Sequence, residues 1–157
     1  MTPAEFDVFA RDILRRAEAA YLSTVDGDGH PRVRAMVNLR NPDLYTAQCR
    51  WIETHLDPLT LVFSTLANSA KVDQIRANPK ASVLYAIPGA FKGITFIGKM
   101  AISQDPIWRE GLYHPSWRVY YPQGAQDPGH ALLVMQPVLA ECWQDTEKFT
   151  FALGDRP

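Results

Sequence analysis

The chain has 157 residues, of which 46% are hydrophobic and 21% charged, and its formal net charge at pH 7 is −1. This length and composition predict one globular domain over residues 1–157, with a continuous core. The near-zero net charge and the lack of a long apolar stretch argue against nucleic acid or a membrane as a partner.

The first predicted element is an amphipathic helix over residues 3–19. Thr2 is a suitable hydroxyl cap, Pro3 suits the first helical position and Glu5 suits the first turn. Apolar residues then recur at spacings of three and four, which places them on one face of the helix.

A β-hairpin is predicted next, with strands over residues 20–25 and 31–39 joined by Asp26-Gly27-Asp28-Gly29. Side chains alternate between the two faces of a strand, so Arg32 and Arg34 share one face of the second strand. Two arginines on one face require either water or an acidic ligand opposite them.

The rest of the chain is predicted to alternate short strands with two further helices. Residues 40–58 have no clear assignment, and 45–55 form either a short helix or a structured loop. Strands are predicted over 59–63, 81–87, 93–103, 131–136, 139–144 and 148–153, helices over 69–78 and 105–113, and a Pro- and Gly-rich loop over 114–129. Short antiparallel strands with helices at the margins indicate a mainly β fold, a small barrel with flanking helices.

The segment Ser64-Thr65-Leu66-Ala67-Asn68-Ser69-Ala70-Lys71 has the strongest functional signal. It leads from a strand into a helix, and Lys71 lies in the first helical turn. A cation is unfavourable there because the free N–H groups already carry partial positive charge, whereas a bound anion would use those groups, the hydroxyls and the lysine together. The pattern predicts a site for a phosphate or carboxylate. The alternative is a lysine that simply points into water.

No other pattern predicts catalytic or metal-binding residues. The four histidines and two cysteines lack the spacing of a metal site, and no Gly-x-Ser-x-Gly occurs. Cys49 and Cys142 are far apart, outside any CxxC motif, and no secretory signal is visible, so we expect reduced thiols and a cytoplasmic location. With no acid–base or nucleophile set in the chain, an enzyme of this sequence would rely on a cofactor.

Four pieces of the sequence, taken in order, resemble a known family. They are Tyr21–Val25 with Gly29-x-Pro31-x-x-Arg34-x-Met36-Val37, then Ser64–Pro79, Gly93–Lys99, and Tyr120-Tyr121-Pro122-x-Gly124-x-x-Asp127-Pro128 leading to Trp143. Together they resemble the FMN-binding split-barrel family of pyridoxamine 5'-phosphate oxidases and related bacterial general stress proteins. The resemblance implies a six-stranded antiparallel split β-barrel with flanking helices, and a homodimer with FMN at its interface.

The resemblance also implies cofactor-binding positions. The isoalloxazine ring and ribityl chain would be held by Arg34 and the backbone of Ala35, Met36, Val37 and Asn38. The ribityl–phosphate end would meet Ser64, Thr65, Ser69, Ala70 and Lys71, and the neighbouring subunit would contribute Gly93, Trp117 and Tyr121. From the residues alone, the aromatic loop Trp117–Tyr121 either covers a core edge or subunit contact, or forms a wall against a flat ring.

Three positions depart from the family pattern. Ala70 stands where the family often has an arginine, so one phosphate ligand is lost unless Arg32 or Arg40 compensates. Because a charge-assisted hydrogen bond contributes about 1.5–3 kcal/mol, FMN affinity would fall by roughly one to two decades. Gly93 stands where the oxidases often place a glutamine. The C-terminal Leu153-Gly154-Asp155-Arg156-Pro157 lacks the arginine motif with which true pyridoxamine phosphate oxidases hold their substrate.

We therefore expect a cytoplasmic, homodimeric FMN-dependent oxidoreductase that acts on an unidentified small molecule, with an electron donor such as NAD(P)H, and not a true pyridoxamine phosphate oxidase. No proton donor is identified. One alternative is a deazaflavin-dependent reductase on the same fold. The other is a non-catalytic stress-response module that holds flavin, haem or nothing.

Overall fold

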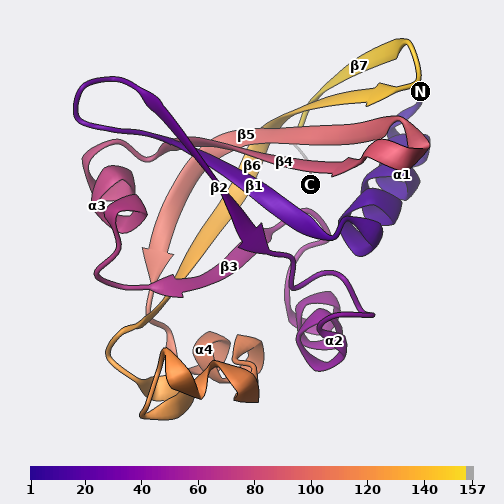
Figure 1. The fold of residues 1–157 in the computed structure, drawn as a ribbon. Helices are drawn as coiled ribbons and strands as arrows, with labels where there is room; N and C mark the ends of the chain where they lie inside the picture. The colour runs from indigo at the N-terminus through magenta and orange to yellow at the C-terminus, as the bar shows by residue number, and fades with distance from the viewer. Residues whose placement is uncertain (155–157) are drawn as a thin grey trace.

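The computed structural model of the protein describes residues 1–154. The strands are β1 (Ala19–Val25), β2 (Pro31–Val37), β3 (Leu61–Leu66), β4 (Lys80–Ile87), β5 (Lys92–Ser103), β6 (His130–Gln144) and β7 (Glu147–Ala152). The helices are α1 (Pro3–Arg16), α2 (Thr46–His55), α3 (Ala70–Ala77) and α4 (Pro106–Leu112), with short 3-10 helices at Pro88–Ala90, Pro115–Val119 and Gly124–Gln126. The strands pair antiparallel in the order β2-β1-β4-β5-β6-β3, and β7 pairs with β6 (Figure 1). The six-stranded split barrel with flanking helices is thus confirmed.

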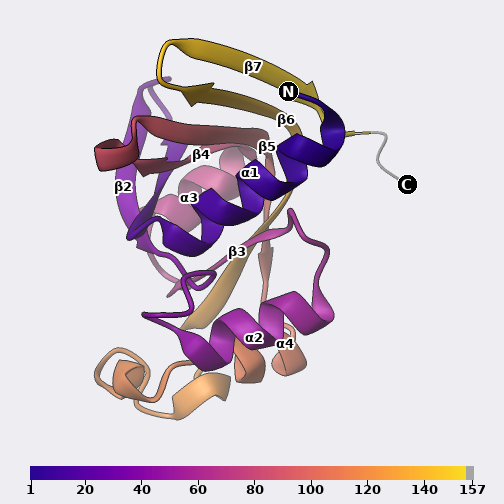
Figure 2. The ribbon, with the colours of Figure 1, turned by 90° about the vertical axis from the view of Figure 1, so that its right-hand side faces the viewer.

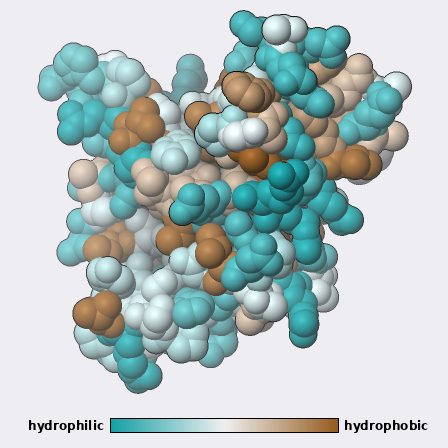
Figure 3. Space-filling view, turned by 45° about the vertical axis from the view of Figure 1, so that its right-hand side comes forward, coloured by the Kyte–Doolittle hydropathy of each residue, from teal (hydrophilic) through white to brown (hydrophobic). Residues whose placement is uncertain are grey.

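The helices flank the barrel on different sides. Figure 1 shows α3 and α1 on opposite sides of the strands, with α2 and α4 together below them. The main core joins α1 and α3 to the barrel interior through residues such as Phe6, Ile13, Val72, Phe63 and Phe96. None of the helices within residues 1–154 is long and apolar enough to cross a membrane. In Figure 3, hydrophobic residues lie scattered among hydrophilic ones on the face shown.

A second, smaller cluster explains the segment that the sequence leaves unassigned. Residues 46–55 form α2, which packs against α4 through a buried cluster outside the main core. The members of this cluster are Leu39, Ile52, Val62, Leu112 and Leu132. Residues 40–58 therefore include a structural helix at the base of the barrel.

Two predicted elements end earlier in the structure. The helix predicted over residues 3–19 ends at Arg16, because Ala17 has an extended conformation (φ −61°, ψ 133°) and β1 begins at Ala19. The strand predicted over 31–39 ends at Val37. The next residue, Asn38, turns its amide nitrogen toward the carbonyls of Leu14 and Ala17, at 2.8 Å each, and so closes the end of α1.

Two other predicted elements are longer in the structure. The strand predicted over 59–63 runs from Leu61 to Leu66, because its last residues pair with the start of β6. The strands predicted over 131–136 and 139–144 are one strand, β6, which contains Pro137. Proline has no N–H for a ladder, but on this edge β6 pairs with β3 only up to Met135 and with β7 only from Leu139. Pro137 falls in the gap between them.

Candidate functional site

Two cations meet at one end of the barrel, where α3 follows β3. Lys71 Nζ on α3 donates to Thr65 Oγ1 on β3 at 3.1 Å. Burial, followed by the positive charge of Arg34, lowers the pKa of Lys71. Burial also lowers the pKa of Arg34, with a further contribution from Arg32. Within the described chain, neither Lys71 nor Arg34 has an acidic partner within 4.0 Å. The two half-buried cations therefore face each other without a neutralising group.

Arg34 is held in place by neutral acceptors. Its Nη1 atom donates to Thr24 Oγ1 at 2.7 Å and to the carbonyls of Leu22 and Arg32, and its Nη2 atom donates to Gln74 Oε1 at 3.0 Å. Thr24 Oγ1 also donates to Gln74 Oε1 at 2.7 Å. These contacts fix the guanidinium beside α3 without cancelling its charge.

The start of α3 offers further unused donors. Ser69 occupies the N-cap position, yet its side chain accepts no hydrogen bond from the helix, and its Oγ is buried without a partner. The amide N–H groups of Ala70 and Lys71 also find no acceptor within residues 1–154. A bound anion would accept from these groups and from the two cations. We call Arg34, Ser69, Ala70 N–H and Lys71 the anion site.

The two predicted hydroxyl contacts, Ser64 and Thr65, point to opposite faces of β3. Thr65 is buried on the face that holds Lys71. The Oγ atom of Ser64 lies on the other face, 3.1 Å from Nε2 of the fully buried His130. The structure thus brings Thr65 to the anion site and gives the Ser64 side chain a different partner.

The side chains of the segment Ala35–Asn38 alternate between the interior and the outer face of the barrel. Met36 is buried in the main core and Asn38 caps α1, whereas Ala35 and Val37 lie exposed on the outer face of β2. The side chains of Met36 and Asn38 are thus engaged within the fold, whereas those of Ala35 and Val37 remain accessible.

Neither Arg32 nor Arg40 replaces the phosphate ligand that Ala70 lacks. Arg32 is largely exposed and lies 3.5 Å from a carboxylate oxygen of Asp26. Arg40 is buried at the start of β3, where Nη2 donates to the carbonyls of Asp57 and Thr60 at 3.2 and 2.6 Å. Because β3 separates Arg40 from Lys71, Arg40 does not compensate for Ala70.

Gly93 leaves room for an aromatic ring rather than for a cofactor-facing side chain. A Cβ atom built at Gly93 would lie 1.9 Å from the Trp143 indole. The two residues pair across β5 and β6, so the indole covers the glycine on the outer face of the sheet. Trp143 thus occupies the space that a glutamine at position 93 would need.

The loop after α4 carries one exposed aromatic residue that the site prediction omits. Tyr121 is buried, with its ring 4.7 Å from that of His130, and Trp117 packs near Tyr45 and Tyr113. Tyr120, in contrast, is 63% exposed and free to meet a neighbouring molecule. The sequence alone does not distinguish these three rings. Gln74 is also missed, although its place one turn after Lys71 on α3 is a usable signal.

A family model described as pyridoxamine 5'-phosphate oxidase matches residues 6–144. A solved protein from Clostridium acetobutylicum, related to general stress protein 26 of Bacillus subtilis, has a TM-score of 0.76 and 20% identity, covering 97% of each chain. General stress protein 26 from Bacillus anthracis has a TM-score of 0.71 and 19% identity, covering 94% of this chain and 99% of its own. No curated protein matches the chain.

A third solved structure is described as a pyridoxamine 5'-phosphate oxidase-related, FMN-binding protein from Nostoc punctiforme. It has a TM-score of 0.61 and 17% identity, and the match covers 97% of each chain. At such identities the solved structures show a shared fold.

Proposed function

The chain belongs to the pyridoxamine 5'-phosphate oxidase family, and from this premise we propose that it binds FMN through the anion site and acts as an oxidoreductase on a small molecule. One similar structure is that of an FMN-binding protein. The phosphate group of FMN is an anion of the kind that the anion site would hold. When bound, the flavin supplies the electron and hydride chemistry, and the chain supplies position and electrostatics.

The observation that carries this proposal is the buried, unpartnered Oγ of Ser69 beside two unneutralised cations. Buried polar groups in proteins are nearly always hydrogen-bonded, and buried charges are nearly always paired. A phosphate oxygen would accept from Ser69 and from the first amides of α3, while its charge would neutralise Lys71 and Arg34. Thr65 keeps the lysine in place by accepting from Nζ.

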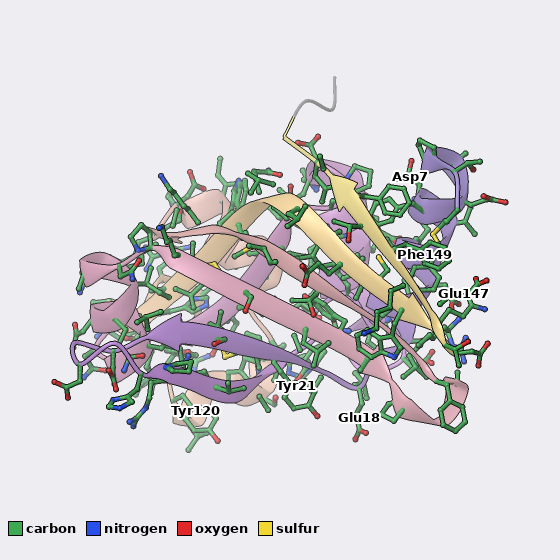
Figure 4. All side chains as sticks on the ribbon, turned by 90° about the horizontal axis from the view of Figure 1, so that it is seen from above. Asp7, Glu18, Tyr21, Tyr120, Glu147 and Phe149 are labelled. Carbon is green, nitrogen blue, oxygen red and sulfur yellow. The ribbon has the colours of Figure 1, made fainter. Side chains whose placement is uncertain are left out.

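A homodimer is part of the proposal, supported by an apolar sheet face that no helix of the described chain covers. Tyr21, Val33 and Val37 lie on the outer face of β1 and β2 and are exposed, Val33 to 66%. Figure 4 shows Tyr21 and Tyr120 projecting from the same side of the molecule. In such a dimer, Tyr120 rather than Tyr121 would reach the neighbouring subunit.

The protein is not proposed to be a true pyridoxamine phosphate oxidase. Its C-terminal sequence lacks the substrate-binding arginine motif, although residues 155–157 of that stretch lie outside the described part of the chain. The proposed substrate is an unidentified small molecule, with NAD(P)H or another reductant as the proposed electron donor.

A visible absorption spectrum of the purified protein, recorded before and after equimolar FMN and desalting, tests the cofactor. We expect a flavin spectrum that elutes with the protein. A colourless protein after desalting would contradict the proposal, and titration with a deazaflavin and with haem would then test the two alternative occupants. Turnover of NAD(P)H by the flavin-loaded protein separates an enzyme from a binding module.

A further inference from the structure

We propose that a groove between α1 and the connection from α2 to β3 is a second binding site, for a ligand that carries a carboxylate on an apolar body. The groove has a volume of about 960 Å³ and also meets Gln136–Val138 of β6. Figure 2 looks onto this side of the molecule, with α1 above α2 and the connection beside them. This inference does not depend on FMN binding.

Arg40, in the wall of the groove, carries the argument. This residue is only 8% exposed. Nη2 donates to two backbone carbonyls, but Nε is buried with no partner, and no carboxylate of the described chain lies within 4.0 Å of the guanidinium. A charge held away from water is costly unless an opposite charge accompanies it.

The other charged side chains of the groove have either an oppositely charged partner or contact with water. Arg15 and Glu53 form an ion pair with each other. Arg11, Asp7 and Asp57 are exposed, so water solvates them. Arg40 is thus the charged group of the groove that gains most from an anion.

The rest of the groove wall determines the chemical character of the ligand beyond its carboxylate. It is lined by the apolar side chains of Val8, Leu14, Leu56, Leu59, Pro137 and Val138. A carboxylate brings one negative charge, which matches the single buried guanidinium, whereas a phosphate dianion would leave a charge unpaired among apolar groups. The groove therefore fits an apolar monocarboxylate.

This groove is distinct from the anion site. Arg40 is anchored at Thr60, just before β3, and Lys71 contacts Thr65 near the end of β3. The five residue steps from Thr60 to Thr65 span roughly 17 Å at the usual rise per residue. One ligand of modest size cannot occupy both places.

Isothermal titration calorimetry with octanoate tests the site, with 1-octanol as a probe of the same chain length that lacks the carboxylate. We expect octanoate to bind saturably, with one site per chain, and 1-octanol to bind at least about tenfold more weakly because it lacks the charge-assisted bond to Arg40. No saturable heat with octanoate, or equal affinity for the two probes, overturns the proposal.

Three substitutions locate the probe. Val138→Trp fills the groove from a side chain that is 55% exposed, and should abolish octanoate binding without disturbing the core. Val119→Trp, at a 78% exposed position outside the groove, should leave the affinity unchanged. Lys71→Ala should also leave it unchanged. Octanoate binding that survives Val138→Trp, or that is lost in Lys71→Ala, overturns the proposal.

Arg40→Met tests the guanidinium itself. The variant should fold with the same secondary structure and bind octanoate no better than it binds 1-octanol. If Arg40→Met does not fold, the decision rests on Val138→Trp, whose side chain lies at the surface.

Discussion

The Nε2 atom of His130 lies 3.1 Å from the hydroxyl oxygen of Ser64, and Nδ1 lies 2.8 Å from the carbonyl of Ala125. A carbonyl only accepts, so Nδ1 carries the proton and Nε2 accepts from the serine hydroxyl. The contact joins β3 to β6 across 66 residues of sequence and holds a neutral, fully buried imidazole in place.

The first prediction concerns pH and stability. Burial is the main cause that lowers the pKa of His130 below its ordinary value of 6.5. As the pH falls below that value, the unfolded chain takes up the proton before the folded chain does, so the free energy of unfolding falls until folded His130 is protonated too. In urea unfolding, wild type should therefore lose stability as the pH is lowered through about 6.5, the ordinary pKa of histidine.

A His130→Gln variant isolates this contribution. It should be less stable than wild type at neutral pH by about 1–3 kcal/mol, because the buried imidazole contacts are lost or weakened. The difference between wild type and variant should shrink as the pH is lowered. A difference that is independent of pH would show that His130 is not responsible.

The second prediction follows from the indole of Trp143 over Gly93. Gly93→Gln should destabilise the protein by about 1–3 kcal/mol or more, since any Cβ must displace the ring. In a Trp143→Ala background the same substitution should cost much less. Urea unfolding of the four proteins of this cycle measures the coupling, and equal costs in both backgrounds would refute the steric account.

Local patterns in the sequence predict much of the fold, and their failures have identifiable causes. The barrel strands are visible through alternation and turn residues, but α2 has Tyr45 at its N-cap with no side-chain cap bond, so it lacks a start signal. Pro137 suggests the end of a strand, yet the local sequence does not show that the edge of β6 facing β3 and β7 is unpaired there, while β5 continues to pair on the other edge.

The residues of the candidate site likewise fall into those that local sequence predicts and those that it does not. Lys71, Ser69 and Thr65 are predicted from one continuous segment, because helix electrostatics acts locally. The contacts of Arg34 with Thr24 and Gln74 depend on how the hairpin meets α3, and the separate orientation of Ser64 depends on His130. Contacts between residues so far apart in the chain cannot be predicted from local patterns in a single sequence.

The third prediction contrasts two helix caps. Thr2 accepts a bond from Glu5 N in a full capping box, so Thr2→Ala should cost about 0.5–2 kcal/mol. Ser69 makes no such bond, so Ser69→Ala should leave the stability of the flavin-free protein within about 0.5 kcal/mol of wild type. Thermal and urea unfolding of both variants tests the contrast. A large loss in Ser69→Ala would mean that its hydroxyl serves the helix rather than a ligand.

The fourth prediction concerns the dimer. Val33→Glu places a charge on the exposed outer face of β2 and should reduce the mass in light scattering from that of a dimer to that of a single 17.7 kDa chain, with unchanged far-ultraviolet circular dichroism. Ile107→Glu, at a 70% exposed position on α4, is the matched control and should stay dimeric. A dimer that survives Val33→Glu would place the interface elsewhere.

The fifth prediction separates the phosphate from the rest of the flavin. Lys71→Ala should weaken FMN binding about tenfold or more, because a charge-assisted bond is lost. Riboflavin has the same ring and ribityl chain but no phosphate, so its affinity should change little in the variant. Fluorescence titration of both ligands with wild type, Lys71→Ala and the surface control Lys99→Ala provides the measurement. If Lys71→Ala weakened both ligands equally, or neither, the phosphate would not lie at the anion site, and the lysine would have another role.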